Sequence, residues 1–369
     1  MVKIITLFFI LSFMSVSATF AETAREYFKF AKFSYDSKEY IKALDFINRA
    51  IDTDPNYING FLLRAEINYS LQEFNEVIED ITLAFNLDKN ASVSMAEFHL
   101  LRADSYIKLE NLNKAMADVD FSIKVNPRIA KAFYLKGIIN TEKLIYFEAV
   151  ENFDQAIELD TDESEYYFKR AELKKVYYKP LAGTKTYESI ISDIKIAIEL
   201  NPNDPRPYKL KCNMLKMSAG DNKDELIREL DGFIEQFPEQ PDFYSERGMA
   251  RVLNYDYRLA LGDFTKAIHL DEFNEANYRN RGLCFHNMKK YQLALNDYTK
   301  SINVLVKKYQ ESENDESIKK ILAQTINMRG MTNQMNGYPD LACDDYYNAA
   351  KLGSKVGLNN YRKNCNVYK

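Results

Sequence analysis

The chain has 369 residues, of which 46% are hydrophobic and 28% are charged, and it contains only 12 Gly and 9 Pro. Apolar residues with so few helix breakers favour a fold made almost entirely of helices. The formal net charge of −5 and the isoelectric point near 5.6 argue against nucleic acid as a partner, because phosphates are bound by a basic stripe and none occurs in the sequence.

The N-terminus has the pattern of a secretory signal peptide. Lys3 precedes an apolar run over residues 4–14, and the small residues that follow suit cleavage after Ala18 or Ala21. The run is too short for a comfortable membrane span, and an uncleaved anchor is the alternative. We expect residues 1–21 to be a cleavable signal peptide and the mature chain to have no membrane span. Because abundant Lys, Asn, Ile and Tyr are typical of an AT-rich bacterial genome, the predicted destination is the periplasm or the cell exterior.

A pair of charges recurs along the rest of the chain: an Arg followed by Ala or Gly, and later an Asp. In five pairs the two residues are 16 positions apart, and in the sixth, Arg170/Asp193, seven inserted residues widen the spacing to 23. The five are Arg64/Asp80, Arg102/Asp118, Arg247/Asp263, Arg281/Asp297 and Arg329/Asp345. Recurrence at a fixed spacing indicates one supersecondary unit copied many times, which forms a stacked array and not a globular core with an active-site cleft.

Other features recur with the charge pair. A small residue follows each Arg and a second small residue stands 19 positions later, as in Ala65 and Ala84. An aromatic or bulky residue usually precedes the first small residue by four positions, an Ala often follows it by twelve, and Pro ends several units. These features, with a period of about 34 residues, resemble the tetratricopeptide repeat. The chain departs from that family in two ways: Tyr, Phe or His99 replaces the usual Trp, and three spacers are longer.

The resemblance implies an all-α fold, a right-handed α-solenoid of about nine antiparallel helix-turn-helix repeats across residues 22–357. Residues 358–369 are expected to form a C-terminal capping segment. In chain order, the repeats are expected to start near Ala24, Ile58, Ala96, Ala130, Ser164, Pro205, Pro241, Glu275 and Ala323.

The spacing of the charge pairs predicts their role. In a hairpin with a short turn, residues 16 apart lie at about the same height on the two helices, so each Arg can meet its Asp. We interpret them as structural ion pairs that set the register of each hairpin; a charged ladder that binds a ligand is the alternative. Two repeats replace both partners, and there Lys136 is expected to face Asn152 and Lys211 to face Glu229.

The four Cys residues fall into two groups. Cys212 occupies the small-residue position of its repeat and Cys284 lies two positions beyond it in another, so we interpret both as buried thiols. Cys343 lies in the second helix of the last repeat and Cys365 in the capping segment. Because exported proteins meet an oxidising environment, a disulfide between Cys343 and Cys365 is a hypothesis.

The sequence contains no pattern of catalysis or metal binding. His99, His269 and His286 are scattered, without the spacing of a zinc site. Residues 183–186 are similar to the end of a phosphate-binding loop, but Tyr178 stands where that loop needs a Gly. We therefore expect no enzyme activity, no cofactor and no metal site.

The family resemblance implies a ligand groove lined by the first helix of each repeat. The residues expected to bind a peptide or other ligand there are Phe28, Tyr35, Tyr69, Tyr134, Phe168, Arg206, Lys209, Asn213, Lys216 and Arg279. Lys209 and Asn213 resemble the start of the clamp by which some members hold peptide carboxylates, but Glu246 and Ala276 break the pattern. The basic cluster of the sixth repeat is therefore either a generic anion site or a solvated basic face.

Insertions offer further candidates. Residues 175–187 lengthen the turn of the fifth repeat and are expected to place Tyr177, Tyr178 and Pro180 on a projecting loop that contacts a partner, with a merely tolerated insertion as the alternative. Residues 311–317 are acidic and polar, and they predict a solvated loop between the last two repeats.

These observations predict an exported scaffold that binds another protein, as an extended peptide or a helix, during assembly of an envelope or secretion complex. The alternative is a non-catalytic subunit or carrier that binds a small molecule or a glycan. The identity of the partner is not encoded in any motif.

Overall fold

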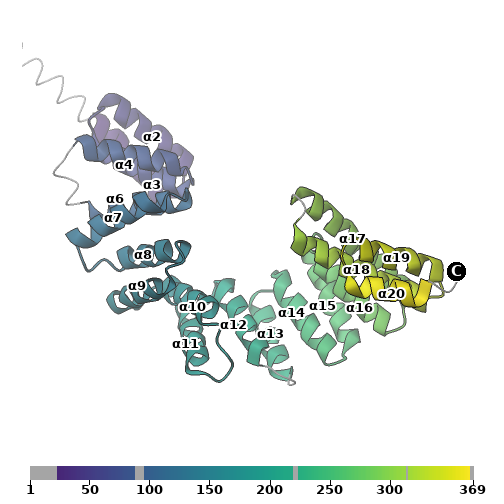
Figure 1. Cartoon of the computed structure of the whole chain (residues 1–369). Coiled ribbons are helices and arrows are strands. Elements are labelled where there is room, and N and C mark those ends of the chain that lie inside the picture. Colours follow the sequence, from purple (N-terminus) through teal and green to yellow (C-terminus); the bar gives the residue numbers. More distant parts are fainter. Residues whose placement is uncertain (1–22, 88–94, 219–222, 313–314, 366–369) are drawn as a thin grey trace, which may run out of the picture. The chain divides into compact units, whose positions relative to one another are not determined.

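The computed structural model describes residues 23–87, 95–218, 223–312 and 315–365. Within these ranges every regular element is an α-helix (Figure 1), so the predicted all-α fold of helical repeats is confirmed. The predicted signal peptide, residues 1–21, lies outside the described residues. None of the helices in the described ranges is both long and apolar enough to cross a bilayer.

The first helix covers residues 23–36. The helices that follow are α2 (Tyr40–Thr53), α3 (Ile58–Ser70), α4 (Phe74–Leu87), α6 (Ala96–Lys108), α7 (Leu112–Val125), α8 (Ala130–Glu142), α9 (Tyr146–Leu159), α10 (Ser164–Tyr178), α11 (Lys185–Leu200), α12 (Pro205–Ser218), α13 (Asp224–Gln236), α14 (Pro241–Leu253), α15 (Tyr257–Leu270), α16 (Glu275–Asn287), α17 (Tyr291–Glu311), α18 (Glu316–Met335), α19 (Pro339–Lys351) and α20 (Lys355–Cys365).

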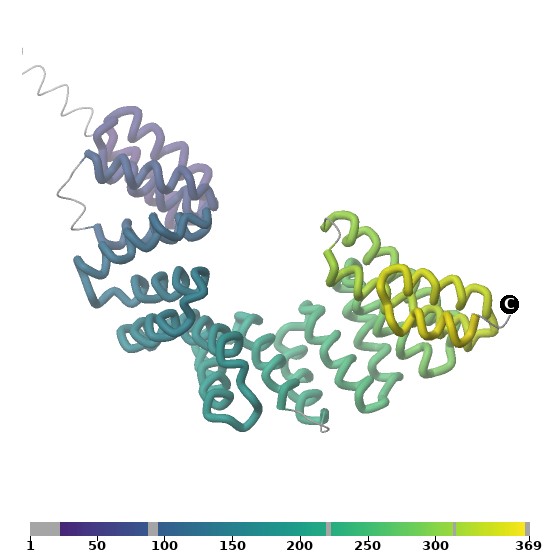
Figure 2. Tube along the Cα trace, in the orientation of Figure 1, coloured from purple at the N-terminus to yellow at the C-terminus, as the bar shows by residue number. Residues whose placement is uncertain are grey.

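The chain forms two compact units, residues 1–179 and residues 180–369. We call them the N-terminal and the C-terminal unit. Each is a stack of helical hairpins, as the trace in Figure 2 shows; α3/α4, α6/α7 and α8/α9 belong to the N-terminal unit, and α12/α13, α14/α15, α16/α17 and α18/α19 to the C-terminal unit. The boundary falls between α10 and α11, inside the predicted fifth repeat.

A small residue in the first helix of each hairpin accommodates a large one in the second. A Cβ placed on Gly137 would lie 2.6 Å from the ring of Phe153, and one on Gly248 would lie 2.9 Å from the ring of Phe264. Gly282 with Tyr298 and Gly330 with Tyr346 repeat this contact. Where the small residue is Ala65 or Ala103, the residue 16 positions later is the smaller Ile81 or Val119, in the same core cluster. Each repeat thus keeps the summed volume of this pair nearly constant, as close packing requires.

In seven of the hairpins, the turn contains one residue in the left-handed backbone conformation. It lies seven positions after the small residue, and most of these residues are not glycine: Lys38, Gln72, Glu110, Leu144, Tyr255, Lys289 and Gly337. This conformation costs a residue with a side chain about 1–2 kcal/mol. Helix packing on both sides of the turn therefore imposes it, because the local sequence does not favour it.

The last repeat differs from the others. The break predicted over residues 311–317 is shorter than expected, because α17 continues to Glu311 and α18 begins at Glu316; residues 313–314 lie outside the described residues. The insertion lengthens the two helices to 21 and 20 residues. Leu305 and Leu322 are buried in the core cluster of these extensions. The capping helix α20 begins at Lys355, before the predicted residue 358, and packs against α18 and α19.

Candidate functional site

The five charge pairs with 16-residue spacing form across their hairpins. The N–O distances are 2.6 Å for Arg64/Asp80, 2.7 Å for Arg102/Asp118, Arg247/Asp263 and Arg329/Asp345, and 2.8 Å for Arg281/Asp297. The sequence did not predict how deep the pairs lie, and all five carboxylates are buried: Asp80, Asp118, Asp263, Asp297 and Asp345. Since these groups are internal, they carry structure and offer no ladder for a ligand.

Four of the five buried carboxylates have a donor besides the paired Arg, unlike the predicted one-to-one pairing. Asp118 also contacts His99, as described below, and Asp80 Oδ2 accepts from Asn68 Nδ2 at 3.4 Å. Asp263 Oδ2 also accepts from Arg251 Nη1 at 2.7 Å, so this carboxylate is shared by two guanidinium groups. Asp345 Oδ2 accepts from Asn333 Nδ2 at 3.0 Å. Asn68, Arg251 and Asn333 each stand four positions after the paired Arg, and residues four apart lie on the same face of a helix. The prediction of a simple ion pair is therefore corrected for these carboxylates, because additional donors satisfy the remaining lone pairs of a buried carboxylate.

The paired Arg residues also reach the preceding hairpin, a contact that the sequence did not predict. Arg64 Nη1 donates to Asn48 Oδ1 at 2.9 Å and Arg247 Nη1 to Asp231 Oδ1 at 2.7 Å, each 16 residues upstream. Arg170 binds Asp154 in the same way, at 2.6 Å. Its pairing with Asp193, which is buried, stays a prediction. The Arg side chains therefore join neighbouring repeats as well as the two helices of one repeat.

Lys136 and Lys211, which stand where other repeats have the paired Arg, differ in the partners that they bind. Lys211 binds Glu229 at 2.8 Å, as predicted. Lys136 does not face Asn152; it binds Asp120 of the preceding hairpin at 2.8 Å. The physical reason is that a carboxylate is a stronger acceptor for an ammonium group than an amide, and the amide nitrogen of Asn152 already donates to the backbone oxygen of Glu148.

The buried side chain of His99 lies between two aromatic rings and beside Asp118. Its ring centroid is 4.3 Å from those of Phe85 and Phe121, and its Nδ1 is 2.8 Å from Asp118 Oδ1. Burial alone would raise the pKa of Asp118, but hydrogen bonds from Arg102 and His99 lower that pKa below its ordinary value. Because it is enclosed by these side chains, His99 is a packing residue.

In the N-terminal unit, the aromatic residues predicted to bind a ligand mostly contact other parts of the unit. Phe28 stands edge-on to Tyr57, Tyr35 lies beside Tyr40, and Tyr134 lies against Tyr166. The hydroxyl of Tyr69 donates to Asp104 Oδ2 at 2.6 Å. Phe168 is buried and is therefore not accessible to a ligand, because its position in α10 turns it into the core.

In the C-terminal unit, the cations of the predicted basic patch are neutralised by carboxylates. Lys209 binds Asp242 at 2.6 Å, Lys216 binds Glu246 at 2.7 Å and Arg206 binds Asp204 at 2.7 Å. The two Lys pairs connect α12 to α14. The cluster is basic in sequence but close to neutral in space.

These pairs border a polar cleft between α12, α14 and α16, which we call the amide cleft. It has a volume of about 320 Å³ and is lined by four Asn side chains, Asn213, Asn274, Asn277 and Asn280, together with Lys209, Asp242, Ser245, Glu246 and Met249. Asn277 is 1% exposed. Its Oδ1 accepts from Ser245 Oγ at 2.6 Å, while its Nδ2 has no acceptor within the described residues. The cleft thus contains a buried hydrogen-bond donor that lacks a partner.

Arg279 is a further unpaired group on α16. It makes no ion pair with any residue that the structure describes, and its burial lowers the pKa of the guanidinium below its ordinary value. Of the predicted groove residues, the structure therefore brings Lys209 and Asn213 into one cleft, places Lys216 and Arg279 on α12 and α16, and leaves the aromatic residues in the other unit.

The loop predicted in the fifth repeat is confined to residues 179–184, so the prediction that Tyr177 and Tyr178 lie on it is wrong. Tyr177 and Tyr178 form the last turn of α10, because this helix continues to Tyr178. Both rings are partly exposed, and the ring of Tyr177 lies 5.4 Å from that of Tyr146. Pro180 is buried and cannot contact a partner.

The four Cys residues form one disulfide and two buried thiols, as predicted. Cys343 and Cys365 form a disulfide that joins α19 to α20. Cys212 and Cys284 are free and buried, and burial raises the pKa of each thiol to about 12, so that both are neutral. Across the described ranges, no three His, Cys, Asp or Glu residues are placed to hold a metal ion.

These features define an all-α repeat protein whose candidate site is a polar cleft between first helices. No family model matches the chain. The chain is 24% identical over 234 residues to the mitochondrial import receptor subunit TOM70 of Homo sapiens; the match covers 61% of the chain and 37% of that protein. It is 22% identical over 264 residues to tetratricopeptide repeat protein 16 of Macaca fascicularis; this match covers 67% of the chain and 29% of that protein. The matches thus span about a third of the length of these relatives.

A solved structure of a tetratricopeptide repeat protein from Parabacteroides merdae superimposes with a TM-score of 0.50 at 18% identity, covering 72% of the chain and 99% of that structure. This similarity shows a shared fold. Together with the recurring sequence features, it shows that the chain has the fold of a tetratricopeptide-repeat protein.

Proposed function

We propose that the chain is an exported scaffold that binds another protein, and that the amide cleft between α12, α14 and α16 holds an extended peptide segment or a helix of that partner. The observation that carries this proposal is the donor of Asn277. A buried donor without an acceptor costs about 1–3 kcal/mol, and a carbonyl oxygen of a bound segment would satisfy it. The neighbouring amides of Asn213 and Asn280 can donate and accept at once, which suits a peptide backbone.

The local charge supports a neutral or mixed segment over a strongly acidic one. Lys209, Lys216, Asp242 and Glu246 already compensate one another at the edge of the cleft. An acidic peptide would have to displace these carboxylates, whereas Arg279 is a cation without a competing ion pair among the described residues. A partner with one acidic residue beside an uncharged stretch fits these groups best.

Export is proposed from the N-terminal pattern, and the Cys343–Cys365 disulfide supports it, because structural disulfides persist in oxidising compartments. Envelope or secretion-complex assembly is the setting in which such a scaffold would act. Fusing residues 1–21 to a phosphatase that is active only after export tests this part: activity supports export, and an inactive intracellular fusion would contradict it.

The binding proposal is tested by affinity capture from the envelope fraction of the source cells. The bait is the chain as wild type, as the double variant Asn213→Ala/Asn280→Ala, and as a matched control, Asn203→Ala/Asn303→Ala, which changes two exposed Asn residues outside the cleft. We expect wild type and control to retain the same stoichiometric protein and the cleft variant to lose it at least tenfold. Equal recovery on all three baits would contradict binding at the amide cleft.

A further inference from the structure

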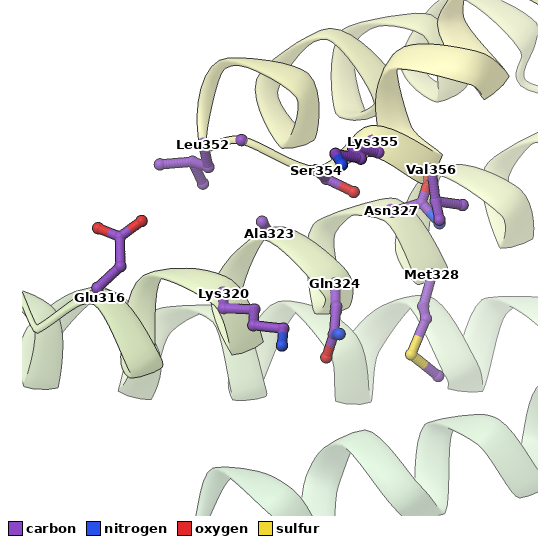
Figure 3. Close-up of a pocket in the computed structure, with 11 residues that line it drawn as sticks. Glu316, Lys320, Ala323, Gln324, Asn327, Met328, Leu352, Ser354, Lys355 and Val356 are labelled. Carbon is purple, nitrogen blue, oxygen red and sulfur yellow. The ribbon is translucent and has the colours of Figure 1, made fainter.

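The lengthened last repeat creates a second cleft, of about 590 Å³, which we call the cap cleft. One side of α18, from Glu316 to Met328, forms its floor, and the turn of residues 352–354 with Lys355 and Val356 of the capping helix forms its roof (Figure 3). The cleft exists because α18 has 20 residues and α20 has only 11, so α20 does not cover the first turns of α18. Its volume is in the range of small-molecule sites, about 300–1,000 Å³.

The polar groups of the cap cleft are mainly hydrogen-bond donors. Lys320 and Lys355 line it and form no ion pair with any described residue, whereas the carboxylate of Glu316 is paired with Lys319 at 3.0 Å. Asn327 is 6% exposed; its Oδ1 accepts from Asn360 at 2.9 Å, and its Nδ2 has only the thioether of Met331, a weak acceptor, at 3.7 Å. The cleft therefore presents two free ammonium groups and a buried amide donor that is poorly satisfied.

Apart from Gln324 and from Ser354, whose hydroxyl accepts from the backbone N–H of Gly357, the remaining lining is apolar and extended. Figure 3 shows Asn327, Lys355 and Val356 together at one end, Ala323 in the middle and Leu352 near the other end. Eleven residues of α18 separate Asn327 from Glu316, which corresponds to about 16 Å along the helix. The N-terminus of α20 adds its positive dipole end and its first backbone N–H groups at the same end as Asn327.

We propose that the cap cleft binds an aliphatic monocarboxylate, with its carboxylate at Asn327 and Lys355, assisted by Lys320, and its hydrocarbon chain over Ala323 toward Leu352. A carboxylate supplies the acceptors that the donors lack, and the chain covers the apolar side chains of Ala323 and Leu352. A peptide fits less well, because its backbone would bring additional N–H donors into a cleft that already has an excess of donors. The cap cleft and the amide cleft share no lining residue, so the outcome of one test does not affect the other proposal.

The test is isothermal titration calorimetry of the chain with sodium octanoate. We expect saturable binding, about fivefold weaker in Lys320→Gln and in Lys355→Gln, as loss of one partly exposed charge contact predicts, and at least tenfold weaker in the double variant. Lys363→Gln, which changes an exposed Lys of α20 outside the lining, is the matched control and is expected to bind like wild type. Octanol and acetate, which lack the charge and the chain, are expected to bind far more weakly than octanoate.

Val356→Trp provides an independent check, since Val356 is 60% exposed and a larger side chain there fills the cleft without disturbing the core. We expect this variant to keep the helical circular dichroism of wild type and to lose octanoate binding. Unchanged binding in the double Lys variant or in Val356→Trp would overturn the proposal. Tighter binding of the tripeptide N-acetyl-Ala-Ala-Leu than of octanoate would also overturn it, in favour of a peptide terminus.

Discussion

The interior of the hairpins and the surface of their first helices follow opposite rules. Inside, nearly every repeat uses the same solution: a small residue faces a large one, and an Arg joins a buried Asp, as in Gly282 with Tyr298 and Arg281 with Asp297. On the surface, the aromatic residues that were predicted to bind a ligand in the N-terminal unit pack locally, whereas the C-terminal unit has two clefts with unsatisfied donors. Repetition therefore indicates architecture, and candidate sites lie where the repeats differ.

The largest expected effect comes from breaking an interior ion pair. Arg281→Met leaves the carboxylate of Asp297, which is 4% exposed, buried without its cation, and we expect a loss of about 3–5 kcal/mol in the free energy of unfolding. Urea unfolding followed by circular dichroism measures it. The double variant Arg281→Met/Asp297→Leu is expected to recover most of the loss, because the buried charge is gone. A cost below about 1 kcal/mol, the value for a surface pair such as Lys136/Asp120, would contradict the interior role of Arg281.

Disturbing the pairing of a small residue with a large one inside a hairpin is expected to have a smaller effect on stability, which a second substitution should reverse. Gly248→Ala places a methyl group 2.9 Å from the ring of Phe264, and we expect overpacking to cost about 1–3 kcal/mol. Gly248→Ala/Phe264→Ile recreates the Ala65/Ile81 combination of the second repeat and is expected to be more stable than Gly248→Ala alone. If the double variant is instead less stable than Gly248→Ala, the volumes of the two positions are not complementary. Thermal unfolding of the three proteins decides this.

Asp118 makes the interior sensitive to pH. Because its pKa in the folded chain is lowered, its ionised form stabilises the fold above the ordinary carboxylate pKa of about 4, and this contribution is lost as the pH falls toward the lowered value. We expect Asp118→Asn to reduce the unfolding free energy at pH 7 and to have a smaller effect at pH 3. Asp120→Asn, which changes an exposed carboxylate on the same helix, is the control. A penalty that does not decrease at pH 3 would show that the ionisation of Asp118 contributes nothing.

The smallest effect on stability is expected at the surface. Lys216→Ala removes the partly exposed pair with Glu246, and we expect a change of about 0–1 kcal/mol in the unfolding free energy. Urea unfolding under the conditions used for Arg281→Met measures it. A loss of several kcal/mol would mean that the border of the amide cleft is part of the core, and the contrast between interior and surface would then be wrong.

Much of the architecture is readable from the sequence because the same physical constraints recur in each repeat. The 16-residue spacing of Arg and Asp predicted hairpins and their register, and the positions of Cys343 and Cys365 relative to the last repeat predicted their disulfide. The all-α repeat class follows from the same periodicity. These are short-range or strictly periodic relations, which a one-dimensional pattern preserves.

Tertiary structure alone decided how the charges are shared. The spacing assigned one cation to each Asp, but Asp263 is bound by Arg251 as well as Arg247, and Asp345 takes a second donor from Asn333. Spacing alone does not show these additional donors, because they are Arg in one repeat and Asn in another. The depth at which a carboxylate is buried, and hence the number of donors it needs, depends on the packing of the whole hairpin.

Contacts between repeats were also decided by the tertiary structure. Lys209 and Lys216 look like a basic patch until α14 brings Asp242 and Glu246 against them. The insertion around residue 311 extends two helices because they bury Leu305 and Leu322 in one cluster. The sequence by itself determined the repeat and its internal pairs; which charges remain free and where a cleft opens depend on the packing of neighbouring helices, whose sequence separation varies with every insertion.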